Sequence, residues 1–458
     1  MRYKLLLSIF LFGNFVWSQM PSELTNAEKV YGLSRFWQEV NYNFVYLDKV
    51  DREAWDDYYI QLIDEVQQTP TDYEYYRLLE KFSARLKDGH TDIYMPEAVR
   101  SRLTETDFGD YRIYLTNIDG KAIVSYVNES KSEEIPVGSE ILKVDGIETG
   151  KYIDQHVKPY ISTSVEHILQ DLGVSRMLKG ALGTSVEIEY RTPKNQIRKL
   201  LLTRSKAIEE KMEPAIGSRE LLEFKWLDKT TAYLALNSFG DDAIVEMFEE
   251  KLPEIAKAKS IVIDLRNNGG GNTDIGVDIL KYFVKDTVLY GSRSSTRKHI
   301  ATYKAWGRWT QEKDTIGNPG ARDTYLAAKD LLIHDFDNKP WKIERPEQIY
   351  VIPIVILFGH NTASAAEDFL IFVENQEHMV TIGEPSYGST GQPYVFELPK
   401  GAAARVCTKK DTYPDGREFV GYGIQPDILV KKKLEDFIND KDPVLMEALK
   451  YLSDNRSL

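Results

Sequence analysis

Apolar residues change their spacing twice along the chain, and the changes divide it into three regions. From about residue 26 to 85, apolar residues recur every three or four positions, for example between Val30 and Trp37, which predicts amphipathic helices. From about 107 to 205 they form short runs bounded by turn residues, which predicts strands. From about 233 to 430 predicted strands and helices alternate, as they do in an α/β domain.

Two runs in the third region are apolar almost throughout. Residues 261–265 and 352–358 have the composition expected of strands that are buried on both faces. A helix is predicted after each strand, over 275–283 and through 369–373. A last helix is predicted after Asp442, because Asp is a favoured N-cap and the proline that follows it fits the first helical position.

A tight turn is predicted in the middle of the second region. Residues 137–146 read Val-Gly-Ser-Glu-Ile-Leu-Lys-Val-Asp-Gly, in which a buried strand is closed by Asp145-Gly146. This segment resembles the part of PDZ domains that precedes their peptide-binding helix. The resemblance implies a PDZ-like, β-rich domain here.

Composition narrows the class of protein. A chain of 458 residues with 42% apolar and 28% charged residues is long enough for two or three globular domains. The formal net charge of −13 disfavours nucleic acid and anionic membrane surfaces as partners. Cys407 is the single cysteine of the sequence, so an intrachain disulfide and a metal site of the CxxC kind are excluded.

The N-terminus has the plan of a secretory signal peptide. Arg2 and Lys4 precede the apolar residues 5–17, and Ser18 stands directly before a plausible cleavage site. The alternative is a membrane anchor, but the apolar run is shorter than the ~20 residues that cross a bilayer. We expect 1–18 to be removed and the protein to be exported, periplasmic or extracellular, without stable membrane insertion.

The first motif with chemical potential follows the apolar run at 261–265. Residues 264–272 read Asp-Leu-Arg-Asn-Asn-Gly-Gly-Gly-Asn, and glycines between a strand and a helix expose backbone N–H groups that bind an anion. We interpret the turn as an oxyanion hole. A phosphate loop is the alternative, but the Gly-Lys-Ser/Thr signature is absent, and a merely flexible turn also remains open.

The second motif follows the apolar run at 352–358. Small residues crowd a turn that contains Ser364 and leads into a predicted helix, so a substrate carbonyl could come close to this hydroxyl. The alternative is that Thr362 or Ser364 only caps the helix. The pairing of one turn rich in N–H groups with one turn that bears a hydroxyl favours catalysis.

Together the two motifs resemble the C-terminal-processing (tail-specific) and tricorn-type serine peptidases. A Pro-Asp pair in the turn 423–428 and the Asp-Pro pair before the last helix also match that family. The resemblance implies that Ser364 is the nucleophile, with Glu367 as a supporting residue three positions later. It also implies that the backbone N–H groups of Gly270, Gly271 and Ala365 hold the oxyanion.

The resemblance also implies a multidomain α/β fold. The expected order is a signal peptide (1–18), a helical N-terminal domain (19–105), a PDZ-like β-rich domain (106–205) and a crotonase-like α/β peptidase core (206–458) that ends in a C-terminal helix.

The family divides on the general base. Tail-specific members use a lysine in a Gly-Lys-Gly turn, and the corresponding position here is Ser389, which argues against a Ser–Lys dyad. The tricorn-type branch uses a histidine from the helical domain, and His90 stands in a segment that resembles this site. That branch has a hydroxyl residue before the histidine, where this chain has Gly89. The group that orients His90 is therefore open among Asp88, Glu418 and Ser389.

Two further features have competing interpretations. His360 stands four residues before Ser364 and is a rival base, although such spacing through a turn need not bring the side chains together. The stretch between 286 and 312 combines Arg and Lys with Tyr and Trp. It is either an exposed hairpin or the lining of a substrate channel.

The sequence therefore predicts an exported serine peptidase that hydrolyses peptide bonds through an acyl-enzyme, with a peptide or protein as substrate. No metal or organic cofactor is called for, and the sequence leaves the oligomeric state open. Two other functions remain possible: a non-catalytic protein that binds peptides or apolar ligands on the same fold, and an acyl-transfer enzyme that acts on esters.

Overall fold

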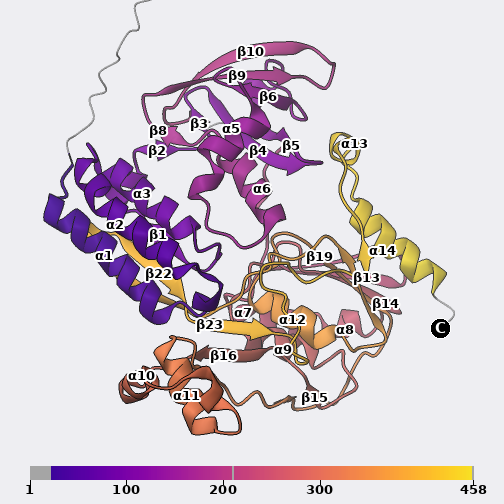
Figure 1. Ribbon diagram of the computed structural model, residues 1–458. Helices are drawn as coiled ribbons and strands as arrows, with labels where there is room; N and C mark the ends of the chain where they lie inside the picture. The colour runs from indigo at the N-terminus through magenta and orange to yellow at the C-terminus, as the bar shows by residue number, and fades with distance from the viewer. Residues whose placement is uncertain (1–21, 209–210, 456–458) are drawn as a thin grey trace, which may run out of the picture.

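The computed structural model describes residues 22–208 and 211–455 as a mixed α/β protein (Figure 1). The predicted signal peptide lies outside the described residues. In the described part, no helix is long and apolar enough to cross a membrane.

Three helices form the N-terminal region, as the sequence predicts. They are α1 (Asn26–Asn43), α2 (Arg52–Gln68) and α3 (Asp72–Ala84). Each begins at a residue whose side chain accepts a backbone N–H of the first turn: Thr25, Asp51 and Thr71. The N-caps fix where the helices start, and their apolar faces are buried.

The second region is a β-rich unit with a hydrophobic core of its own. Its main strands are β4 (Tyr111–Ile118), β5 (Lys121–Asn128), β6 (Glu140–Val144), β9 (Ser185–Arg191) and β10 (Ile197–Thr203), with α5 (Thr149–His156) and α6 (Glu166–Arg176) packed on them. Asp145 and Gly146 both have positive φ, at 47° and 78°, so the predicted tight turn is present.

The third region is built on a six-stranded sheet of order β12-β13-β14-β19-β20-β24. The strands are β12 (Leu222–Trp226), β13 (Thr231–Leu236), β14 (Ser260–Asp264), β19 (Ile354–Phe358), β20 (Met379–Gly383) and β24 (Ile428–Leu429), and only the β12–β13 pair of this sheet is antiparallel. Helices α9 (Thr273–Leu280) and α12 (Ala365–Val373) pack on one face. Helix α14 (Pro443–Asp454) covers the other face.

The helical region is not an independent unit. Its buried side chains belong to the same hydrophobic cluster as one face of the six-stranded sheet. The short strand β1 (Asp92–Tyr94), which follows the helices, pairs with β22 (Ala403–Cys407) of the third region, and β22 in turn pairs with β21 (Pro393–Glu397). These contacts place residue 90 against the third region.

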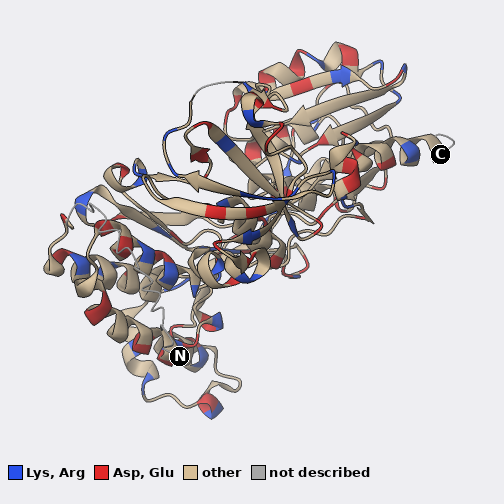
Figure 2. Cartoon of the chain, turned by 90° about the horizontal axis from the view of Figure 1, so that it is seen from above, with Lys and Arg blue, Asp and Glu red and all other residues tan. Residues whose placement is uncertain are grey.

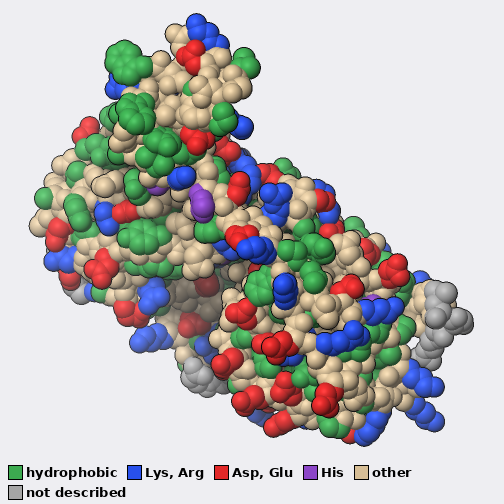
Figure 3. Space-filling model, turned by 90° about the horizontal axis from the view of Figure 1, so that it is seen from below, with side chains coloured by type: hydrophobic (Ala, Val, Ile, Leu, Met, Phe, Trp, Pro, Cys, Tyr) green, Lys and Arg blue, Asp and Glu red, His purple; other side chains and the backbone are tan. Residues whose placement is uncertain are grey.

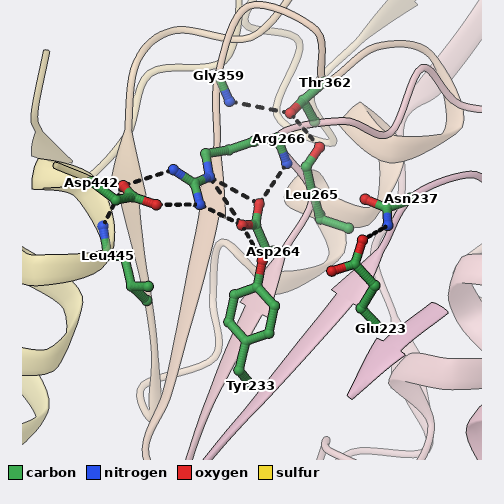
Figure 4. A network of polar contacts seen from close by, with 10 residues as sticks. All are labelled: Glu223, Tyr233, Asn237, Asp264, Leu265, Arg266, Gly359, Thr362, Asp442 and Leu445. Carbon is green, nitrogen blue, oxygen red and sulfur yellow. Dashed lines mark hydrogen bonds and ion pairs between the residues drawn. The ribbon is translucent and has the colours of Figure 1, made fainter. Parts of the chain in front are cut away.

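A partly buried ionic network fixes the end of β14 (Figure 4). The guanidinium of Arg266 binds both carboxylate oxygens of Asp264 and those of Asp442, the N-cap of α14. Tyr233 donates its hydroxyl to Asp264 at 2.8 Å. The network ties the start of the glycine turn to the C-terminal helix.

The cationic and aromatic stretch forms part of an exposed projection. Helices α10 (Ala301–Gly307) and α11 (Pro319–Ala328) pack on each other, and Trp306 and Trp309 are 60% and 86% exposed. Figure 3 shows hydrophobic and basic side chains together on the projection at its top. Arg297 differs, because it is buried and donates to the carbonyls of Asn41 and Tyr42. Elsewhere, acidic and basic residues are interspersed along the elements (Figure 2).

Candidate active site

Ser364 occupies the turn between β19 and α12 in an unusual backbone conformation. Its φ of 55° and ψ of −123° are rare for a residue with a Cβ, and such strain is common at functional sites. Its side chain makes no helix-capping hydrogen bond, because the N–H of Glu367 donates to the Ser364 carbonyl at 2.7 Å. The Thr362 hydroxyl donates to the Leu265 carbonyl instead. Neither hydroxyl therefore caps helix α12, so the alternative that these residues only cap the helix is not supported.

The glycine turn after β14 packs directly against Ser364. A Cβ on Gly270 would lie 2.7 Å from the Cβ of Ser364 and 2.6 Å from the Ala363 carbonyl oxygen, and the φ of Gly270 is 97°. Glycine is required here because any side chain would displace the serine. Asn268 links the two turns, since its carbonyl accepts the Ala363 N–H at 3.1 Å.

The geometry corrects one part of the predicted oxyanion hole. The N–H of Gly270 donates to Asn268 Oδ1 at 2.9 Å, so it is already used within the turn. Gly270 contributes to the site because the lack of a side chain lets the turn pack against Ser364. Within the described part of the chain, the N–H groups of Gly271 and Ala365 have no hydrogen-bond partner, which leaves these two as candidate donors.

Glu367 joins the Ser364 turn to the loop after β20. Its Oε2 accepts the Ser364 N–H at 3.0 Å, and its Oε1 accepts the Gly388 N–H at 2.7 Å and the Ser386 hydroxyl. Complete burial raises the pKa of Glu367 to about 8, although the three hydrogen bonds oppose this. The carboxyl group fixes the loop 386–389 relative to Ser364.

His90 contacts the same loop. Its Nδ1 lies 2.6 Å from Ser389 Oγ, so Ser389 is the one of the three candidates that contacts the ring. Gly89 makes room for this contact, because a Cβ there would lie 2.8 Å from Ser389 Oγ. Burial, helped by the charge of Arg405, lowers the pKa of His90 to about 4. The ring is therefore neutral near pH 7.

The other candidates for orienting His90 have different partners. Asp88 accepts the backbone N–H of His90 at 3.1 Å and does not reach the ring. Glu418 forms ion pairs with Lys49 and Lys410, so its predicted role beside His90 is wrong. Glu418 stands five residues before Gly423, and its carboxylate is satisfied by Lys49 and Lys410.

The ring nitrogens of His360 contact other residues and do not bond to Ser364. Its Nδ1 lies 2.5 Å from Asp171 of α6, and its Nε2 lies 3.9 Å from Glu384. The ring stacks on His167 with 4.4 Å between centroids. Both ring nitrogens therefore face carboxylates at the contact between the β-rich unit and the third region.

Ser364 and His90 are connected through a loop rather than by a direct hydrogen bond. Within the described residues their side chains do not bond to each other, whereas Glu367 binds the Ser364 turn and Ser389 of the Glu367-bound loop contacts His90. Catalytic hydrogen bonds are often long without substrate and shorten when it binds. In the part of the chain that the structure describes, no group of three or more His, Cys, Asp or Glu side chains is placed to hold a metal ion.

Sequence reasoning missed Ser386, Asn268 and Arg405. Ser386 links Glu367 to the turn 423–428, because its hydroxyl donates to Glu367 and accepts the Ile424 N–H. No pattern marks Ser386 or Arg405 in one sequence. Asn268 alone had a signal, since an Asn beside three glycines is well placed to bond the turn.

Comparison with known proteins agrees with this arrangement. Residues 230–430, which hold both turns, match the model of peptidase family S41. The carboxyl-terminal-processing protease of Picosynechococcus is 23% identical over 375 residues, covering 79% of this chain and 74% of that protein. The protease of the same name from Synechocystis is 21% identical, over 96% of this chain and 90% of that protein.

The chain is a serine-type peptidase. Its residues 230–430 match peptidase family S41, and it is similar to carboxyl-terminal-processing proteases. Among solved structures, the similarity to mature CPAF covers 90% of this chain and 94% of that chain, with a TM-score of 0.64 and 13% sequence identity. Mature CPAF complexed with lactacystin gives a TM-score of 0.63. These two similarities concern the fold.

Proposed function

We propose that this chain hydrolyses peptide bonds of peptide or protein substrates with Ser364 as nucleophile and His90 as general base. The observation that carries the assignment is the loop 386–389, which Glu367 binds to the Ser364 turn and whose Ser389 holds the His90 ring. The loop 386–389 thus contacts both the Ser364 turn, through Glu367, and the His90 ring.

The chemistry follows from the protonation state of His90. With Nδ1 protonated and donating to Ser389 Oγ, the lone pair of Nε2 accepts the proton of the Ser364 hydroxyl as the serine attacks a carbonyl. The N–H groups of Gly271 and Ala365 stabilise the oxyanion that forms. His90 returns the proton to the leaving amine, and water then hydrolyses the acyl-enzyme by the same steps in reverse.

Several finer assignments belong to the proposal. Use of His90 places the protein in the histidine-using, tricorn-type branch of the family. The β-rich unit is interpreted as PDZ-like and the third region as a crotonase-like core. Export remains a prediction from the first eighteen residues, and the absence of a membrane-spanning helix in the described part is compatible with it.

A fluorophosphonate probe tests the proposal directly. We expect it to label Ser364, as located by peptide mass spectrometry, and to block hydrolysis of casein-type substrates. A protein that folds, binds peptides and remains unlabelled would support the non-catalytic alternative, which the missing lysine motivates. Faster turnover of esters than of peptides at equal occupancy would favour the ester-directed alternative.

Glu367→Gln should weaken the site without removing a reacting group. An amide that keeps its oxygen toward Ser386 and Gly388 turns its NH₂ toward the Ser364 N–H, so a buried donor loses its acceptor at a cost of about 1–3 kcal/mol. We expect kcat/KM to fall by about 10–100-fold and the melting temperature to fall as well. Glu374→Gln, on the exposed end of the same helix, is the matched control. Equal activity of the two variants would contradict the role of Glu367.

A further inference from the structure

Arg405 lies where the third region meets the loop that carries His90. It stands on β22 directly opposite Asp92, the first residue of β1. Its Nη2 donates to the Gly89 carbonyl at 3.1 Å, and its guanidinium lies 5.6 Å from the centre of the Tyr94 ring. A side chain of the third region therefore holds the peptide unit that immediately precedes His90.

The charge of Arg405 is not cancelled by an ion pair. Within residues 22–208 and 211–455 no carboxylate lies within ion-pair distance of it, and its Nε is buried without a hydrogen-bond partner. The nearby charges on β23 (Lys409–Thr412) differ in this respect, because Lys409 and Asp411 lie 3.1 Å apart and pair with each other.

The remaining charged groups around His90 are carboxyl groups. Asp88 lies in the same loop and binds the His90 backbone, and Asp92 begins β1. Burial raises the pKa of both. After burial, Arg405 contributes most to lowering the pKa of His90, with a smaller effect of the same sign from Lys409 and an opposite one from Asp411.

We infer that Arg405 is a positioning residue for His90, acting through the Gly89 carbonyl and through its uncompensated charge. The hydrogen bond fixes the backbone on which the imidazole stands relative to β22 and, through the neighbouring loop, to Ser389. The charge disfavours the imidazolium, so the ring remains a proton acceptor at pH values where an ordinary histidine is charged. This role rests on His90 being the base of the proposed function.

Two substitutions separate the two effects. Arg405→Lys keeps the charge and loses the planar donor, so kcat/KM on the high-pH plateau of its pH profile should fall by about tenfold. The pH at which kcat/KM declines on the acidic side should stay as in the wild type. Arg405→Gln removes the charge as well, so the plateau should fall and the acidic limb should move to higher pH by about one pH unit. Arg417→Gln is the matched control, because Arg417 is paired with Asp415 and Glu374 and should leave plateau and limb unchanged.

A spectroscopic readout keeps the inference testable apart from peptidase activity. In protein labelled on its histidines, the NMR signal missing in His90→Gln reports the pKa of His90, which should rise in Arg405→Gln and stay in Arg405→Lys. An equal rise in both variants, or no rise in either, overturns the electrostatic part. An unchanged plateau in both variants overturns the positioning part. A wild-type protein that cleaves no peptide refutes the proposed function, while the NMR titration still tests the effect of Arg405 on His90.

Discussion

Ser364→Ala should abolish peptide hydrolysis while the protein stays folded. The hydroxyl is the proposed nucleophile, and loss of a serine nucleophile lowers kcat on the order of 10⁶-fold in enzymes of this chemistry. The fold should tolerate the change, because the hydroxyl does not cap α12 and the turn is held by the backbone N–H of Ser364 on Glu367. We expect the free energy of unfolding to change by less than about 1 kcal/mol.

The measurement is kcat/KM on a casein-type substrate, together with thermal unfolding. Ser453→Ala, on the exposed face of α14, is the control and should behave as wild type. A pure Ser364→Ala protein that cleaves at the wild-type rate would end the mechanism. If that variant were inactive and also unfolded, Ser364→Gly would replace it, because glycine removes the hydroxyl and tolerates the positive φ.

His90→Ala should lower kcat by about 10²–10⁴-fold, the usual loss for a missing acid–base group. A base must be neutral to accept the proton, so activity disappears as the pH falls through the pKa of His90. An ordinary histidine would place this limb at about pH 6–7. Burial lowers the pKa of His90 to about 4, so the expected limb of kcat/KM is near pH 4.

His360→Ala is the matched histidine control. It should lose much less activity, because both nitrogens of His360 already face carboxylates. The pH profile of kcat/KM between pH 3 and 9 measures both effects in one series. If His360→Ala were inactive while His90→Ala kept full activity, the base would be misassigned, but Ser364 and the oxyanion donors would stand.

Local patterns in the sequence predicted the elements that carry Ser364. Apolar runs at 261–265 and 352–358 are β14 and β19 within two residues, because strands buried on both faces require such runs. The helix predicted over 275–283 begins two residues earlier, at Thr273, since Asn272 accepts an N–H of the first turn as its N-cap. Each of these features depends on near neighbours in the chain.

Contacts between distant segments could not be predicted in the same way. Ser389 was one of three candidates for orienting His90, and only the folded chain brings it to the ring. Glu418 was chosen for its place in a motif, but Lys49 and Lys410 bind it instead. The Gly270 N–H is not available to an oxyanion because it donates to the side chain of Asn268. The spacing of residues in the sequence does not reveal how that side chain is oriented.

His90 comes from the N-terminal region, so the proposed active site is complete only after distant segments of the chain have met during folding. Gly270 and Ser364 are 94 positions apart, whereas His90 and Ser389 are 299 apart, so the proposed base reaches its place only when a very long segment closes. Closing distant segments is slow compared with forming local turns. In a partly folded chain, Ser364 would therefore stand without the proposed proton acceptor, and peptidase activity would arise only after the two segments have met.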